Sequence, residues 1–161
     1  LERFTMNKTA ISLALAGMAA LPAIGQAREI NLSTTLKDYR GNEAYLAIYV
    51  TDAQGAYQRT LWVAGKKAKY YKHLRDWAQG GGSKPAEFDG LTGASVGGGE
   101  TLEVAVELED ALIDAGYEIR IDSAVEDKRD NRGEIKLPLT QQATTVNGGA
   151  QGYVDSFSYH F

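Results

Sequence analysis

Alternating apolar and polar positions predict that this chain folds mainly into β-strands. Residues 28–36 place Ile30, Leu32 and Thr34 on one face, which is the period of two expected for a strand. Residues 42–52 alternate in the same way but carry apolar side chains on both faces. The remaining predicted strands are 57–63, 101–108, 118–121, 134–139 and 154–161.

The segments between these strands carry turn, helix and loop signals. A glycine closes a turn at residues 52–55, which predicts that the strands on either side pair as a hairpin. Residues 66–79 change period, because Tyr70, Leu74 and Trp77 fall at i, i+4 and i+7, and we predict one short amphipathic helix there. Loops, turns and connectors are predicted at the glycine-rich or polar segments 80–85, 88–99, 127–133 and 141–152.

A tight corner precedes the strand at residues 118–121. The run Asp114, Ala115, Gly116 and Tyr117 is similar to the tyrosine corner of immunoglobulin-like sandwiches, in which the hydroxyl bonds back to upstream backbone. A simple hairpin turn is the alternative. About seven strands at short intervals predict an all-β fold, an immunoglobulin-like antiparallel β-sandwich with one short inserted helix. The corner predicts that Tyr117 is buried with its hydroxyl bonded to backbone.

The first part of the chain has the pattern of a secretory signal peptide. Lys8 supplies a positive charge, an apolar run follows, and Gly25 and Ala27 are the small residues of a cleavage site. The alternative is a buried or membrane-anchoring helix, but the run is shorter than the roughly 20 residues that span a bilayer. We predict cleavage after Ala27, a mature chain that begins at Arg28, and a periplasmic location.

Composition narrows the possible functions. The length of 161 residues allows one domain and a leader, so we predict signal peptide and upstream residues at 1–27 and a single β-sandwich domain at 28–161. The net charge of −4 offers no basic surface for nucleic acid. With no cysteine and with His73 and His160 as the only histidines, the chain lacks the residues for disulfides, thiolate sites or a multi-histidine metal centre.

The segment from residue 89 to residue 95 carries the candidate chemistry. Asp89, Thr92, Gly93, Ala94 and Ser95 resemble the Asp-x-x-Thr/Ser-Gly-Ala-Thr/Ser signature of extracytosolic proteins that receive covalent flavin mononucleotide (FMN) from a flavin transferase. The resemblance implies that Ser95 is the acceptor, linked to the flavin through a phosphoester. The small Gly93 and Ala94 are expected to clear the approach to the hydroxyl, and glycines 97–99 are expected to keep the loop deformable. Thr92 is expected to hold the turn, and Asp89 either orients the acceptor or contacts the transferase. The alternative is a glycine-rich hairpin loop with ordinary turn hydrogen bonds.

The resemblance extends along most of the chain. Trp62, the lysine-rich segment ending in Trp77, the motif, the tyrosine corner and the terminal residues 158–161 are similar, in that order, to domain-of-unknown-function family 2271. Membership implies a sandwich fold and an association with flavin transferases and PepSY-type membrane proteins in extracytosolic electron transfer. The expected function is therefore a small exported flavoprotein that carries electrons and is a substrate of the transferase rather than an enzyme.

Other residues have an ordinary explanation beside a functional one. Trp62, Tyr70, Tyr71 and Trp77 are flat surfaces for an isoalloxazine, although the two tryptophans are expected in the core. A basic patch either docks a redox partner or is a solvated face; it consists of Lys66, Lys67, Lys69, Lys72 and Arg75. Residues 127–134 are read as a turn rather than a calcium loop, and no hydrolase signature is present. The alternative function is a non-redox periplasmic binding or adaptor module.

Overall fold

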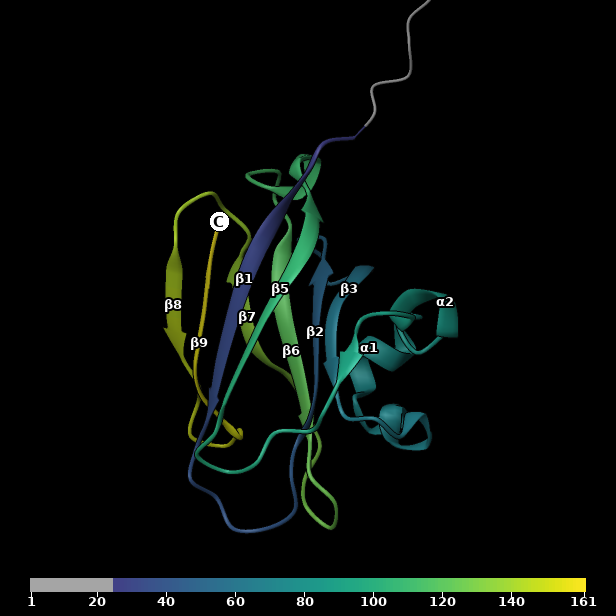
Figure 1. Ribbon diagram of the computed structural model, residues 1–161, viewed down its shortest axis with the longest axis vertical. Coiled ribbons are helices and arrows are strands. Elements are labelled where there is room, and N and C mark those ends of the chain that lie inside the picture. Colours follow the sequence, from purple (N-terminus) through teal and green to yellow (C-terminus); the bar gives the residue numbers. More distant parts are fainter. Residues whose placement is uncertain (1–24) are drawn as a thin grey trace, which may run out of the picture.

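The computed structural model describes residues 25–161, and strands dominate it. The strands are β1 (Ala27–Leu36), β2 (Tyr45–Thr51), β3 (Tyr57–Ala64), β4 (Thr92–Gly93), β5 (Thr101–Glu109), β6 (Glu118–Ala124), β7 (Asn131–Pro138), β8 (Thr144–Asn147) and β9 (Val154–His160). They form two sheets, in the orders β5-β1-β9-β8 and β4-β3-β2-β6-β7, which face each other (Figure 1). Every pair is antiparallel except β3 with β4. The predicted all-β sandwich is confirmed.

The alternating pattern is explained by burial between the sheets. Ile30 and Leu32 of β1 face Leu46 and Ile48 of β2 within one core cluster, and all four are at most 2% exposed. The second apolar face of β2 has its own cover, since Ala47 and Tyr49 belong to a separate buried cluster on the outer side of the sheet. Strand β2 is therefore apolar on both faces because it is packed on both faces.

Short helices supply that outer cover. They are η1 (Ala68–His73), α1 (Arg75–Gln79) and α2 (Pro85–Phe88), beside β3 in Figure 1, and a further turn, η2 (Asp110–Leu112), follows β5. The prediction of one helix over residues 66–79 is wrong in its continuity, because Leu74 has φ −84° and ψ 76° and separates η1 from α1. Leu74 and Trp77 are fully buried as expected, and the tyrosine that packs with them is Tyr71.

A buried carboxylate fixes this helical layer to the sheet. Asp122 on β6 is 0% exposed and accepts hydrogen bonds from the Tyr49 hydroxyl (2.9 Å), the Trp77 N–H (2.8 Å) and the Gly133 N–H (2.6 Å). Burial raises the pKa of Asp122, an effect that the two backbone donors oppose. One side chain thus ties α1 and β7 to β6.

The predicted tyrosine corner is wrong. Tyr117 is only partly buried, because it lies just before β6, where the sheet ends, and its hydroxyl has no hydrogen-bond partner within residues 25–161. Tyr159 on β9 makes the equivalent contacts instead. Its ring is 1% exposed, and its hydroxyl donates to Pro138 O and accepts from Thr140 N, both at 2.9 Å. This tyrosine joins the last strand of one sheet to the end of β7 in the other.

Three predicted boundaries also differ from the structure. The connector at 141–152 contains β8, an edge strand whose single apolar residue, Val146, gives too little alternation to identify it. The loop at 88–99 contains β4, and β7 begins at Asn131 rather than at residue 134. The described residues therefore hold nine strands rather than about seven.

Candidate functional site

The motif lies along the free edge of β3. Two backbone hydrogen bonds hold it there, from Val63 N–H to Leu91 O and from Gly65 N–H to Gly93 O, each 2.8 Å long. Upstream, the ring of Phe88 packs in the aromatic cluster under the helices. The motif thus includes the outermost strand of the sheet and the residues after it. It is attached to β3 by two backbone hydrogen bonds and to the helical layer through Phe88.

Gly93 is small because a tryptophan lies against it. A Cβ on Gly93 would lie 2.6 Å from Cζ2 of Trp62, closer than any side-chain contact allows. We expected Gly93 to clear the approach to the acceptor, but the structure shows that it clears space for an indole that packs against the sandwich core. The Trp62 Nε1–H is buried and has no hydrogen-bond partner within the described residues.

Ser95 lies opposite the start of β2. Ala44 and Val96 form an antiparallel bridge with N–O distances of 2.6 and 3.0 Å, and its register places Ser95 across from Tyr45. Side chains that are opposite each other in such a pair are on the same face. The Ser95 hydroxyl is partly exposed and donates a 2.5 Å hydrogen bond to Oε2 of Glu43. The hydroxyl proton of the candidate acceptor therefore points toward a carboxylate oxygen.

The other motif side chains do not contact that hydroxyl. Asp89, Thr92 and Ala94 are exposed, and the side chains of Asp89 and Thr92 make no hydrogen bond within residues 25–161. The residue that orients Ser95 is Glu43, which sequence reasoning missed. It precedes the motif by about fifty positions, and only the Ala44–Val96 bridge brings the two segments together.

The glycines after the motif approach other backbone rather than open solvent. A Cβ on Gly98 would lie 2.5 Å from Tyr39 O, and the Gly99 N–H donates to Lys37 O at 3.0 Å. We expected these glycines to keep the loop deformable. Instead, they let the segment pack closely against the β1–β2 connection.

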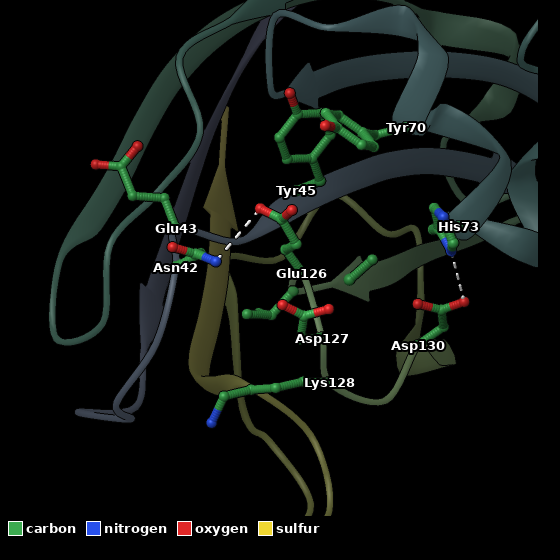
Figure 2. A pocket seen from close by; sticks show the side chains of 11 residues that line it. Asn42, Glu43, Tyr45, Tyr70, His73, Glu126, Asp127, Lys128 and Asp130 are labelled. Carbon is green, nitrogen blue, oxygen red and sulfur yellow. Dashed lines mark hydrogen bonds and ion pairs between the residues drawn. The ribbon is translucent and has the colours of Figure 1, made fainter.

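A pocket of about 250 Å³ adjoins this site on the outer face of the sheet (Figure 2). Glu43 is among the lining residues, but its carboxylate points away from Tyr45 and Glu126 in Figure 2 and accepts the Ser95 hydrogen bond, so the backbone at Glu43 links the motif to the pocket. The lining residues come from the β1–β2 connection, the ends of β2 and β6, η1 and the β6–β7 turn: Asn42, Glu43, Tyr45, Tyr70, His73, Ala124, Val125, Glu126, Asp127, Lys128 and Asp130. Tyr70 lines this pocket, whereas Tyr71 is buried.

The remaining candidate residues are placed as follows. Trp77 is in the core, with its Nε1–H donating to Thr60 Oγ1 at 2.9 Å. Asp130 accepts hydrogen bonds from Arg75 (2.8 Å) and pairs with His73 (3.1 Å), which anchors the β6–β7 turn to the helical layer. All five members of the basic patch are exposed, and Arg75 is the one that pairs with Asp130.

The acidic pair at the end of β5 does not form a catalytic dyad. Glu109 pairs with Arg59 at 2.6 Å, and Asp110 pairs with Arg28 at 2.7 Å. Each carboxylate therefore has its own cation. Within residues 25–161, no three metal-binding side chains are grouped for an ion, and no helix is long and apolar enough to cross a membrane.

Together, the fold and the site define a β-sandwich protein that presents a carboxylate-bound serine from an edge of its sheet, next to an aromatic pocket. Residues 27–156 match the family described as predicted periplasmic protein (DUF2271), and the chain belongs to that family. No curated protein and no solved structure matches the chain.

Proposed function

We propose that this protein is a small exported flavoprotein that carries electrons, with FMN linked to Ser95 by a flavin transferase. The single observation that carries the proposal is the partly exposed Ser95 hydroxyl, hydrogen-bonded to Glu43 at the edge of a pocket. The description of the family as periplasmic supports export. The proposed signal peptide, with cleavage after Ala27, lies largely at residues 6–24, outside the described residues.

The attachment chemistry assigns a role to each of the two side chains. Ser95 Oγ forms the new bond to phosphorus, and its proton passes to Oε2 of Glu43, which already accepts it at 2.5 Å. Joining free FMN to a hydroxyl would release water, and such a condensation is unfavourable in aqueous solution. The donor is therefore an activated flavin dinucleotide. Its phosphoanhydride bond breaks, a nucleoside monophosphate leaves, and Glu43 returns the proton to solvent. The chain is a substrate in this step and not the catalyst.

The surroundings of Ser95 fit a flavin. The neighbouring Ala94 is exposed and small, so a transferase meets no bulky side chain beside the hydroxyl. A bound flavin supplies reversible electron transfer, and the protein supplies position and electrostatics. The exposed lysines of η1 and the segment before it are the proposed contact for a PepSY-type membrane redox partner.

The test is labelling of the exported protein by a flavin transferase in the presence of magnesium. Intact mass should increase by one FMN group in the wild type and in Ser95→Thr, and Ser95→Ala should show no increase. Ser83→Ala is the matched control, because Ser83 is an exposed serine in the same glycine-rich region and is outside the motif. Glu43→Gln keeps the shape but loses the base, so labelling should slow on the order of 100-fold.

The contrary result would be an unlabelled wild type beside a control acceptor that the same transferase labels. That outcome would reject the flavin proposal and favour the adaptor module, in which the exposed lysines of the basic patch contact a partner without redox chemistry.

A further inference from the structure

The pocket near Ser95 has one aromatic side and two apolar residues in its floor, and polar or charged side chains complete its lining. Figure 2 shows the rings of Tyr45 and Tyr70 together on one side; their centroids are 5.8 Å apart and their planes are nearly perpendicular, at 87°. Ala124 and Val125, at the end of β6, are buried beneath. A flat aromatic side over an apolar floor favours a flat, largely apolar ring system as the occupant.

One of these walls is fixed in place without any ligand. A Cβ on Gly65 would overlap the ring of Tyr45, so the ring rests directly on that backbone. The Tyr45 hydroxyl accepts the Lys67 N–H at 3.1 Å, and the ring of Tyr71 packs 6.2 Å away. A pre-formed wall reduces the ordering cost of binding.

The charges at the rim exclude a phosphate group from the pocket. Glu126, Asp127 and Asp130 line it beside the single lysine Lys128, while the carboxylate of Glu43 is bonded to Ser95. Asn42 donates a 3.3 Å hydrogen bond to Glu126 (Figure 2). A neutral ring with N–H donors is suited to such acceptors, whereas an anion is repelled.

We infer that this pocket is the binding site for the ring system of the flavin whose phosphate is attached at Ser95, a step that rests on the proposed function. The register puts Ser95 and Tyr45 on one face, and Glu43 joins the serine to the rim. The volume of about 250 Å³ is below the roughly 300–1,000 Å³ of sites that enclose a whole ligand, so the pocket holds the ring while the phosphate stays outside.

The first experiment separates ring binding from attachment. Riboflavin, which has the ring but no phosphate, is titrated into wild-type protein made without a transferase, and quenching of flavin fluorescence is followed. Saturable quenching is expected, and FMN should bind more weakly than riboflavin because of the acidic rim. Tyr70→Leu should weaken riboflavin binding about threefold to tenfold, the value of one aromatic contact.

Tyr117→Leu is the matched control, since Tyr117 is also partly buried but lies away from the pocket, and it should leave riboflavin affinity unchanged. A second readout uses the labelled protein, in which Tyr70→Leu should raise the fluorescence emission per covalently bound flavin. Equal affinity and equal emission in wild type and Tyr70→Leu would overturn the inference. Riboflavin binding without any transferase labelling would instead reject the proposed function and support the ring site.

Discussion

Replacing Gly93 with alanine tests why the motif contains a glycine. The added Cβ would lie 2.6 Å from Trp62 Cζ2, and the backbone of Gly93 is held by the 2.8 Å hydrogen bond from Gly65 N–H. The indole packs against the core, so neither side can move without losing contacts. Overpacking of this kind costs about 1–3 kcal/mol, and we expect Gly93→Ala to lower the free energy of unfolding by that amount.

The assay is urea unfolding followed by circular dichroism. Gly149→Ala is the control, because a Cβ there meets nothing within 4 Å, and its stability should stay within about 0.5 kcal/mol of wild type. Measured in a Trp62→Leu background, the Gly93→Ala change should cost less than about 0.5 kcal/mol, since Cζ2 is gone. An equal cost in both backgrounds would refute the assignment of the glycine to the indole.

Two further predictions concern buried hydrogen bonds. Asp122→Asn should cost about 1–3 kcal/mol in unfolding experiments, because an amide has one acceptor oxygen for the N–H groups of Trp77 and Gly133. Burial raises the pKa of Asp122 above its ordinary value, so its contribution to stability is complete below about pH 4 and is lost as the pH rises through the folded pKa. The difference in unfolding free energy between wild type and Asp122→Asn should therefore narrow as the pH rises from about 4. Tyr159→Phe should cost about 1–3 kcal/mol in thermal or urea unfolding, while Tyr117→Phe should change stability by less than about 0.5 kcal/mol, and the reverse order would restore the predicted corner.

The candidate site shows how far a local motif can be interpreted. The sequence predicts Ser95 as the acceptor because a motif is a local arrangement of residue types. It could not identify Glu43, which meets Ser95 only through the bridge between Ala44 and Val96. It also could not show that an indole requires a glycine at residue 93, because Trp62 is about thirty positions earlier and reaches Gly93 only across the edge of the sheet.

The sequence by itself determined the sandwich, since alternation over β1, β2, β5 and β9 requires strands whose apolar faces are buried. It did not determine which tyrosine of η1 is buried, because the i, i+4 and i+7 spacing grouped Tyr70 with Leu74 and Trp77, and Tyr71 packs there instead. Only the tertiary structure decided which tyrosine bonds across the sheets. Tyr117 follows a turn and Tyr159 lies within β9, but a hydroxyl finds a backbone partner only where a second element passes close by. Tyr159 meets the end of β7, and Tyr117 lies at a sheet end where the described residues offer it no partner.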